Sequence, residues 1–467
     1  MYKNWNFENS YLKLSKIFYS NTIPDRFPNL KVILKNKELA NSLNLEDVNF
    51  DNFIINSVNN PEKNSFSQAY AGHQFGNFTM LGDGRATILG EHLNFKKKRY
   101  DIQLKGSGKT PYSRDGDGKG TLKSMLREFI VSEAMNNLNI KTTRSLAILK
   151  TGEKIFRERF EQGGILVRVA KSHIRVGTFQ LASMSKKKEH IEELLNYSIE
   201  RLYPELTDNK NKYFKFFEKV AENQINLILD WLRVGFIHGV MNTDNMSLSG
   251  ETIDYGPCAF LDEYNPNKVF SSIDHRGRYA FNNQPKIALW NLARLAETFL
   301  HLINKDEKVA IKKIEKILIS YEKKYKELWL KMMKNKIGIN KNHEKDLSLI
   351  TELLDLMHVF KLDYTNTFID IERNDMSKFD FMRDWNLKLF ERKKLNSKIE
   401  NFKNINPKLI PRNHIIENLL NESEKGIFDN LNIILNLLKN PFKNNIPEKY
   451  TKMPEENEKV HQTFCGT

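Results

Sequence analysis

The chain has little cysteine and no long apolar run, and we expect no N-terminal leader. Only two cysteines occur in 467 residues, Cys258 and Cys465, which argues against a disulfide-stabilised fold and favours a reducing compartment. No apolar run reaches the roughly 18 residues that a membrane-spanning helix needs. Residues 1–8 include an acid and lack the apolar core of a signal peptide. We therefore expect a cytoplasmic protein without a membrane partner.

Positive charge is in excess, since 73 Lys and Arg residues outnumber 58 Asp and Glu residues and give a net charge of +15. Such a balance can indicate nucleic-acid binding. The excess is spread along expected surface helices such as 306–336, however, and no basic stripe is interleaved with aromatic residues. A nucleic-acid partner is therefore not expected, and a monomer is favoured. An apolar share of 40% is ordinary for a globular protein, and the length allows two lobes.

The most informative motif is the loop 238–245, which is followed by Asp254-Tyr255-Gly256. It places Asp244 beside Asn245, with a second carboxylate, Asp254, beyond a short hairpin. In kinase-like phosphotransferases the loop carboxylate faces the attacking hydroxyl, while the Asn and the second Asp bind metal. Oxygen ligands of this kind suit Mg²⁺. The alternative is an Asn- and Asp-rich turn without chemistry.

Glycine-rich and cationic segments earlier in the chain could bind a nucleotide. Residues 81–90 predict a glycine turn that runs into a strand, and glycine lets the backbone approach phosphate closely. A predicted strand over 100–106 carries Lys105, and an amphipathic helix over about 121–138 carries Glu128. In kinases a strand Lys and a helix Glu form the ion pair that holds the phosphate-binding Lys.

The segment Gly106-Ser107-Gly108-Lys109-Thr110 looks like the end of a Walker A loop. The full motif needs a glycine at position 103, where Gln103 stands. Pro111 follows at once, where the helix of a P-loop should already be running. We interpret the segment as a flexible polar loop near a nucleotide.

Taken together, these motifs resemble the selenoprotein O (SelO) family, densely over residues 65–300 and more loosely beyond. The resemblance rests on these stretches: 70–76, 81–86, 103–114, 132–135, 142–146, 168–175, 238–246, 252–257, 277–279, 284–285 and 290–292. It implies an α+β, protein-kinase-like, two-lobed fold with a strand-rich N-lobe, a helical C-lobe and extra C-terminal helices.

The resemblance also implies an activity. SelO proteins bind ATP turned around in the pocket, transfer AMP to Ser, Thr or Tyr hydroxyls of other proteins, and release pyrophosphate. ATP and Mg²⁺ are thus the implied cofactors, and Mn²⁺ could replace Mg²⁺. A conventional protein kinase and a non-catalytic pseudokinase scaffold stay open as alternatives, although intact Asp244, Asn245 and Asp254 favour a catalyst.

The family motifs assign roles to individual residues of this sequence. Asp244 is the implied general base, Asn245 and Asp254 hold Mg²⁺, and Glu128 pairs with Lys105. The implied nucleotide contacts are Gly82, Gly84, Arg85, Lys105, Asp117, Gly118, Arg168, Arg175 and Asp254. Four of these are cations, more than a simple kinase lobe needs, and they could anchor a buried pyrophosphate. The alternative for a lone Arg is a solvated surface position.

A cysteine near the C-terminus is a further point of resemblance. Many SelO members carry selenocysteine or cysteine at the place of Cys465, and it can pair with a loop cysteine beyond the D-x-G segment. Here the segment 265–272 contains no cysteine, so Cys258 is the only partner available. A redox switch between Cys258 and Cys465 and a buried Cys258 with an unpaired tail thiol are both open.

The chain divides into four expected regions. We expect an N-terminal extension over 1–64, a nucleotide-binding N-lobe over 65–180, a helical C-lobe with the catalytic loop and metal site over 181–440, and a mobile tail over 441–467 that ends in Cys-Gly-Thr. Helices are predicted over 186–203, 212–234, 284–303 and 306–336.

Overall fold

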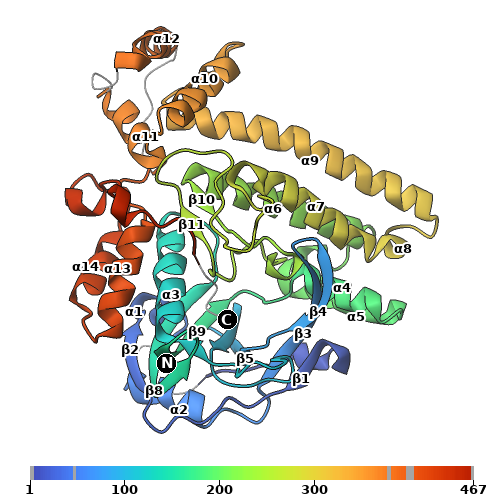
Figure 1. Ribbon diagram of the computed structural model, residues 1–467. Helices are drawn as coiled ribbons and strands as arrows, with labels where there is room; N and C mark the ends of the chain where they lie inside the picture. The colour runs from blue at the N-terminus through green and yellow to red at the C-terminus, as the bar shows by residue number, and fades with distance from the viewer. Residues whose placement is uncertain (1–4, 46–48, 376–379, 396–403, 464–467) are drawn as a thin grey trace.

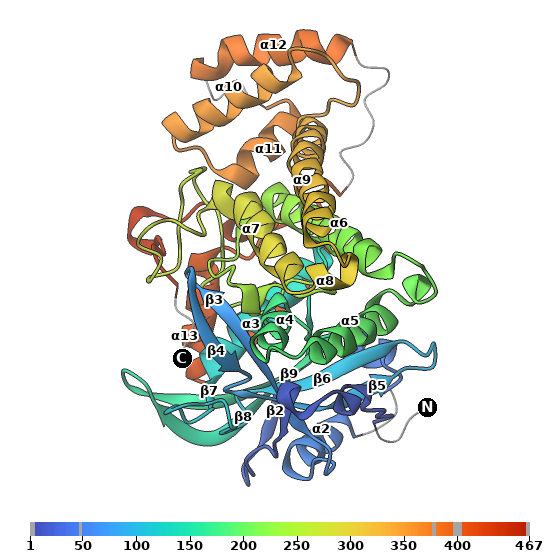
Figure 2. The same cartoon turned by 90° about the vertical axis from the view of Figure 1, so that its right-hand side faces the viewer.

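The computed structural model describes residues 5–45, 49–375, 380–395 and 404–463. Its architecture is α+β, with a large sheet at one end of the molecule and helices over the remainder (Figures 1 and 2). None of the helices in these ranges combines the length and the apolar character that crossing a bilayer requires.

Nine strands of the described residues form the main sheet. They are β1 (Tyr19–Asn21), β2 (Lys31–Lys35), β3 (Phe66–Gln74), β4 (Asn77–Gly82), β5 (Ala86–Leu93), β6 (Arg99–Lys105), β7 (Gly120–Thr121), β8 (Arg144–Phe156) and β9 (Phe160–Ala170). The order is β1-β3-β5-β6-β9-β8-β2, with β4 on β3 and β7 on β9. Because β1 and β2 belong to this sheet, the boundary expected at residue 64 does not coincide with an edge of the sheet.

A second, two-stranded sheet pairs β10 (Phe236–Ile237) with β11 (Ala259–Phe260). The helices are α1 (Lys37–Ser42), α2 (Phe50–Asn59), α3 (Leu122–Asn137), α4 (Val176–Met184), α5 (Lys188–Leu202), α6 (Lys212–Arg233), α7 (Gln284–Glu297), α8 (Leu300–Ile303), α9 (Glu307–Lys336), α10 (Asp346–Val359), α11 (Tyr364–Arg373), α12 (Arg383–Lys394), α13 (Asn413–Glu424) and α14 (Asp429–Leu438).

The predicted helices over 186–203, 212–234 and 306–336 correspond to α5, α6 and α9 within two residues at each end. The predicted helix 284–303 is instead divided into α7 and α8. The chain leaves helical geometry at Phe299, whose backbone has φ −133° and ψ 23°. The ring of Phe299 is fully buried beside Phe179 and Phe216, so core packing outweighs continuation of the helix.

Helix α3 connects the sheet to the site. Thr121 caps its first turn by accepting a hydrogen bond from Ser124 N. The helix lies between the sheet and α13 (Figure 1), and both of these faces are covered. This explains why Glu128, in the middle of the helix, is only 2% exposed.

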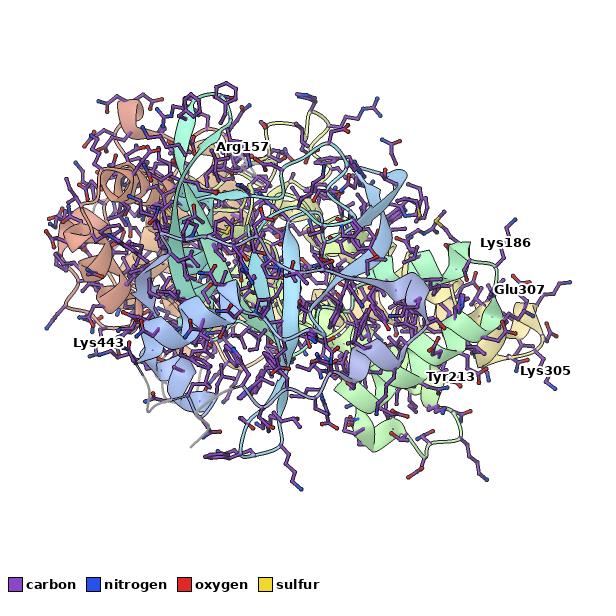
Figure 3. The ribbon with its side chains drawn as sticks, turned by 90° about the horizontal axis from the view of Figure 1, so that it is seen from below. Arg157, Lys186, Tyr213, Lys305, Glu307 and Lys443 are labelled. Atoms are coloured by element: carbon purple, nitrogen blue, oxygen red, sulfur yellow. The ribbon has the colours of Figure 1, made fainter. Side chains whose placement is uncertain are left out.

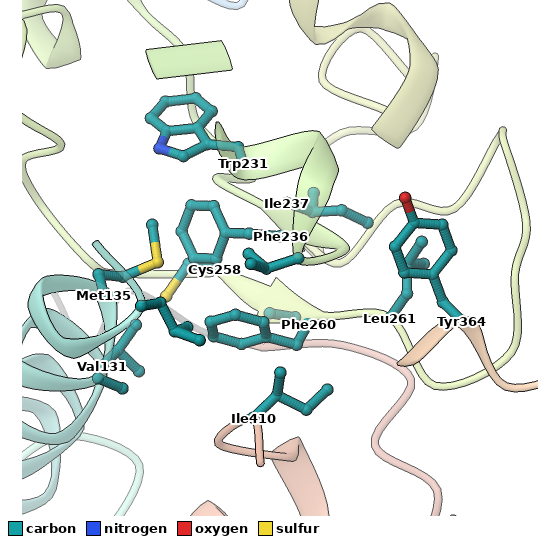
Figure 4. Packing of buried hydrophobic residues seen from close by; sticks show 14 of the residues in the cluster. Val131, Met135, Trp231, Phe236, Ile237, Cys258, Phe260, Leu261, Tyr364 and Ile410 are labelled. Atoms are coloured by element: carbon teal, nitrogen blue, oxygen red, sulfur yellow. The ribbon is translucent and has the colours of Figure 1, made fainter. Parts of the chain in front are cut away.

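A hydrophobic cluster holds α3, the end of α6 and the β10–β11 pair together. Figure 4 shows Val131 and Met135 of α3 facing Cys258 and Phe236, with Trp231 above them. All five are buried. The cluster fixes both ends of the loop between β10 and β11, which contains Asp244 and Asp254.

Helices α10, α11 and α12 extend beyond α9 at the end opposite the sheet (Figure 2). The described part of the tail, 441–463, which was expected to be mobile, lies against the chain after β11. Lys459 Nζ is 2.8 Å from Glu263 Oε1, and Thr463 N donates to Phe270 O at 3.0 Å. Exposed lysines are found at separate places, and Lys305 and Lys443, for example, lie at opposite ends of the molecule (Figure 3).

Candidate active site

A cleft of about 770 Å³ opens between the main sheet and the loop that joins β10 to β11. Its lining includes every residue that the sequence proposed for catalysis, metal or nucleotide: Gly82, Gly84, Arg85, Lys105, Asp117, Gly118, Arg168, Arg175, Asp244, Asn245 and Asp254. Glu128 lies behind the cleft, in contact with Lys105. Segments far apart in the sequence therefore meet at one cavity of a size suited to a small ligand.

Lys105 at the end of β6 is held by two carboxylates. Its Nζ lies 2.7 Å from Glu128 Oε2 and 2.7 Å from Asp254 Oδ1. The structure thus contains the Lys–Glu pair suggested by the order of strand and helix. It also connects this pair to the carboxylate of the D-x-G segment, so Lys105 is fixed from both sides.

Arg168 on β9 is fully enclosed rather than solvated. Its Nη2 donates to Asp254 Oδ1 at 2.6 Å, its Nε donates to Glu128 Oε1 at 2.8 Å, and its Nη1 donates to Gln103 Oε1 at 3.1 Å. Its side chain is 2% exposed. The surface alternative for this residue is therefore wrong, because a buried guanidinium needs these acceptors.

Arg175, at the start of α4, is similarly buried and links three loops. Its Nη1 donates to the backbone oxygen of Asp244 at 3.0 Å and to Asp254 Oδ2 at 3.4 Å. Its Nη2 donates to Asp83 Oδ1 at 3.4 Å, and its guanidinium carbon lies 4.5 Å from the centre of the Tyr70 ring. Sequence reasoning missed Asp83 and Tyr70, because nothing in a short turn or strand marks a residue that will be buried against an arginine.

Asp254 is the point on which these cations converge. Burial alone would raise the pKa of its carboxyl group, but the charges of Arg168, Lys105 and Arg175 outweigh burial and hold the pKa well below its usual range. Its backbone is left-handed, with φ +63°, a conformation that Asp adopts more readily than most residues. The carboxylate is therefore ionised and held in a fixed place.

Asp244 has a different environment. It is 6% exposed, and its Oδ1 has no hydrogen-bond partner in the part of the chain that the structure describes. Burial raises its pKa to about 6, and the nearby charge of Arg175 limits the rise. A group with this pKa is mainly ionised at neutral pH and can still accept a proton, as a general base must.

The end of β3 holds the loop that carries Asp244. His73 N donates to Thr243 Oγ1 at 2.7 Å, and Phe75 N donates to Asn242 Oδ1 at 3.1 Å. At Gly72, an added Cβ would lie 2.7 Å from Asp244 Oδ1. A glycine is needed at this point because the strand backbone passes directly against the carboxylate.

Asn245, next to Asp244 in the chain, also lines the cleft. Its Nδ2 donates to Val240 O at 3.0 Å, which leaves the amide oxygen as the end able to face a cation. Among the described residues there is no cluster of three or more His, Cys, Asp or Glu side chains that could enclose a metal. Mg²⁺ does not need one, since it is usually bound by one or two protein oxygens together with substrate phosphates. The oxygens of Asn245 and Asp254 fit that requirement.

The two turn glycines have a packing role. An added Cβ at Gly82 would lie 2.3 Å from Tyr112 Cγ, and one at Gly84 would lie 2.9 Å from Tyr112 O. Thr110 Oγ1 donates to Asp83 O at 2.7 Å. The segment that looked like a Walker A end is thus a loop folded over the glycine turn.

Asp117 and Gly118 lie at the outer end of the cleft. Asp117 accepts two hydrogen bonds of 2.9 Å from Arg157, and these bonds lower the pKa of its carboxyl group. Gly118 has φ +69°, and an added Cβ would lie 2.0 Å from Gly108 O. Both residues therefore shape the covering loop, and their contact with nucleotide stays a prediction.

Cys258 is completely buried, and burial raises the pKa of its thiol to about 11 (Figure 4). Cys465, the partner proposed for it, lies outside the described residues. The redox pairing therefore stays a prediction, although Cys258 has neither the exposure nor the low pKa of a reactive thiol.

Known proteins match the chain over nearly its whole length. The family model described as "Protein adenylyltransferase SelO" matches residues 1–444. A "Protein nucleotidyltransferase YdiU" of Clostridium perfringens (strain 13 / Type A) is 48% identical over 482 aligned positions, which cover 99% of this chain and 98% of the relative. Proteins of the same name from Pelagibacter ubique (strain HTCC1062) and from Clostridium botulinum (strain Hall) are each 47% identical, over 99% of this chain and 99% and 98% of the relatives. The chain belongs to the SelO family of protein adenylyltransferases.

Proposed function

We propose that this enzyme transfers AMP from ATP to Ser, Thr or Tyr hydroxyls of proteins and releases pyrophosphate. Membership of the family makes it a protein nucleotidyltransferase, with ATP as a substrate. The proposal of AMP transfer rests on the observation that one cleft contains two carboxylates whose pKa values are shifted in opposite directions. Asp254 is permanently ionised by its cations, whereas Asp244 has a raised pKa and an unpaired oxygen. Such a division suits one metal ligand and one base.

We propose that the chain has a kinase-like, two-lobed arrangement. The N-lobe would comprise residues 65–180 together with β1 and β2, and the helical C-lobe would comprise 181–440. Residues from both ranges line the cleft, which would then lie between the two lobes. A nucleotide there would contact the glycine turn and covering loop on one side and the catalytic loop on the other.

The buried cations suit the phosphates of ATP. Lys105, Arg168 and Arg175 all contact Asp254, and Arg85 also lines the cleft. A triphosphate carries more negative charge than one carboxylate, so it would compete for these cations through charge-assisted hydrogen bonds. We place its β- and γ-phosphates beside them, which leaves the α-phosphate nearest to Asp244.

Asn245 and Asp254 would hold Mg²⁺, and Mn²⁺ could take its place. When bound, the ion would neutralise phosphate charge and polarise the reacting phosphoryl group. The remaining chemistry belongs to the protein. Asp244 would accept the proton of the acceptor hydroxyl as the hydroxyl oxygen attacks the α-phosphorus. The bond to the β-phosphate then breaks, and the arginines would stabilise the departing pyrophosphate.

The products released distinguish this activity from the alternatives. With ATP, Mg²⁺ and a mixture of acceptor proteins, the enzyme should release pyrophosphate at a rate that depends on the acceptor. Asp244→Asn should slow that release by roughly 10²–10⁴, the usual contribution of a general base. Asp208→Asn makes the same chemical change at an exposed site outside the cleft and should leave the rate unchanged.

Two results would contradict the proposal. Release of ADP in place of pyrophosphate would identify a conventional kinase. Nucleotide binding without acceptor-dependent release of either product would identify a scaffold. Asp244 would then have no role as a general base.

A further inference from the structure

A cationic and aromatic platform lies next to the catalytic loop and has no part in the proposed chemistry. It consists of Arg278, Trp290, Arg294 and His73. The guanidinium carbons of Arg278 and Arg294 lie 4.7 Å and 5.1 Å from the centre of the Trp290 ring. The ring of His73 meets the same indole edge-on, with 5.1 Å between centroids. Such contacts hold guanidinium groups in fixed positions.

Backbone neighbours connect the platform to the loop that carries Asp244. His73 N donates to Thr243 Oγ1 at 2.7 Å. Tyr279, which follows Arg278 in the chain, donates from its hydroxyl to Asn242 Oδ1 at 2.5 Å. Two platform residues are therefore placed by the same contacts that place the catalytic loop, so their distance from Asp244 is fixed.

Arg278 has an unused capacity to bind an anion. In the described ranges Arg278 forms no ion pair with a carboxylate, and its polar contact is a hydrogen bond to the Tyr279 hydroxyl. Its Nε is buried, so an anion would have to meet the outer nitrogens of the guanidinium. Arg294, by contrast, pairs with Glu297. Burial lowers the pKa of His73, and the charges of Arg294 and Arg278 lower it further, while the hydrogen bond with Gln180 and the charge of Glu297 oppose them. His73 is thus neutral at pH 7, and Arg278 supplies the uncompensated positive charge.

Apolar side chains flank this charge. Phe78 and Met80 of β4 are 44% and 51% exposed. The ring of Phe78 lies 5.1 Å from that of His73, centroid to centroid. The surface therefore combines one available guanidinium with exposed apolar groups, which suits a peptide segment with both acidic and apolar residues.

We infer that the Arg278 platform selects acceptor proteins that carry an acidic residue close to the modified hydroxyl. This inference rests on the proposed function. The spacing comes from β3 and its turn: Gly72 lies against Asp244, whereas the Cβ position at Gly76 is 3.9 Å from the Arg278 guanidinium. Because β3 ends at Gln74 and residues 75–76 turn back into β4, this separation is smaller than the roughly 13 Å that four extended residues would span. An extended acceptor segment covers it in at most about four residues, so the acid is expected within four positions of the acceptor.

The test uses peptides with one acceptor hydroxyl and either Asp or Lys at each position from one to six residues away, on both sides. At one or more positions within four residues of the acceptor, the full-length enzyme should prefer Asp over Lys by about tenfold in kcat/KM, the usual worth of one hydrogen bond to a charged group. Arg278→Glu should reverse the preference to Lys, and Arg278→Ala should abolish it. Arg276→Glu makes the same charge change two residues away, at an exposed position with no contact to Trp290, and should keep the preference.

The outcomes separate the inference from the activity beneath it. Peptides that are labelled with AMP without any acid preference, or a preference unchanged in Arg278→Glu, would overturn the role of Arg278 and leave AMP transfer intact. ATP binding measured for each variant should match that of the unmodified enzyme, and a loss of ATP binding in Arg278→Ala would make Arg278 part of the nucleotide site and overturn the inference. Failure of the unmodified enzyme to label any peptide or protein would refute the proposed function itself.

Discussion

The Asp244→Asn variant should be more stable than the unmodified protein and nearly inactive. Burial raises the pKa of Asp244 from 3.8 to about 6. Ionisation is therefore easier in the unfolded chain, and it costs the folded state stability at every pH above 3.8, with the full cost reached above about pH 6. A difference of about two pKa units corresponds to about 3 kcal/mol. An uncharged Asn avoids this cost.

The measurement is denaturant unfolding of the nucleotide-free protein at two pH values. At pH 8 the free energy of unfolding of Asp244→Asn should exceed that of the unmodified protein by about 3 kcal/mol, and at pH 5 by about half as much. Asp208→Asn, at an exposed site, should show no difference at either pH. Equal stability of Asp244→Asn and the unmodified protein at pH 8 would show that ionisation of the buried carboxylate does not destabilise the folded state. The reasoning for its role as a base would then fail.

The same pKa predicts how the rate depends on pH. The kcat/KM of the unmodified enzyme should fall about tenfold per pH unit below pH 6, as Asp244, the proposed base, becomes protonated. Arg175 lowers the pKa of Asp244, so Arg175→Gln should move this fall to higher pH. A fall caused by protonation of the nucleotide would not move in the variant, and that result would contradict the assignment.

Three further changes test other parts of the site. Asp254→Ala should abolish transfer and lower the free energy of unfolding by about 3–5 kcal/mol, since it leaves buried cations without their carboxylate. Inorganic tripolyphosphate should restore part of that stability. If tripolyphosphate had no effect on the stability of the variant, this would count against a phosphate site. Gly72→Ala would place a methyl group 2.7 Å from the carboxylate of Asp244, so transfer should fall at least tenfold with ATP affinity unchanged, and normal turnover would show that this contact is unimportant. Dithiothreitol should change neither the activity nor the peptide map, because the thiol of Cys258 is buried with a pKa of about 11, and a crosslinked peptide joining Cys258 to Cys465 would contradict this.

Part of the site could be predicted from the sequence because it depends on local order. A strand that ends on Lys105 and a following helix with Glu128 on its buried side must bring the two charges together if the helix packs across the sheet. Asp244 and Asn245 are adjacent, and the β10–β11 hairpin returns Asp254 to them. Short-range geometry decides these contacts.

The remainder depends on pairings between distant segments. Arg168 and Arg175 gave no local sign of burial, and only the pairing of β9 with β6 places Arg168 beside Gln103. Likewise, β2 pairs with β8, so the boundary expected at residue 64 cuts through the sheet. Gly82 and Gly84 were interpreted as phosphate-binding glycines, but their contact with Tyr112 depends on a loop that no periodicity describes.

Transfer of AMP rather than phosphate is the central claim, and the position of the label in the acceptor tests it most directly. The enzyme is incubated with Mg²⁺, acceptor protein and ATP labelled at either the α- or the γ-phosphate, and the protein is then isolated. The cation cluster around Asp254 and the base proposed at Asp244 predict that label from the α-phosphate is retained on the acceptor and label from the γ-phosphate is not. Retention of the γ label alone would show a kinase and contradict the account.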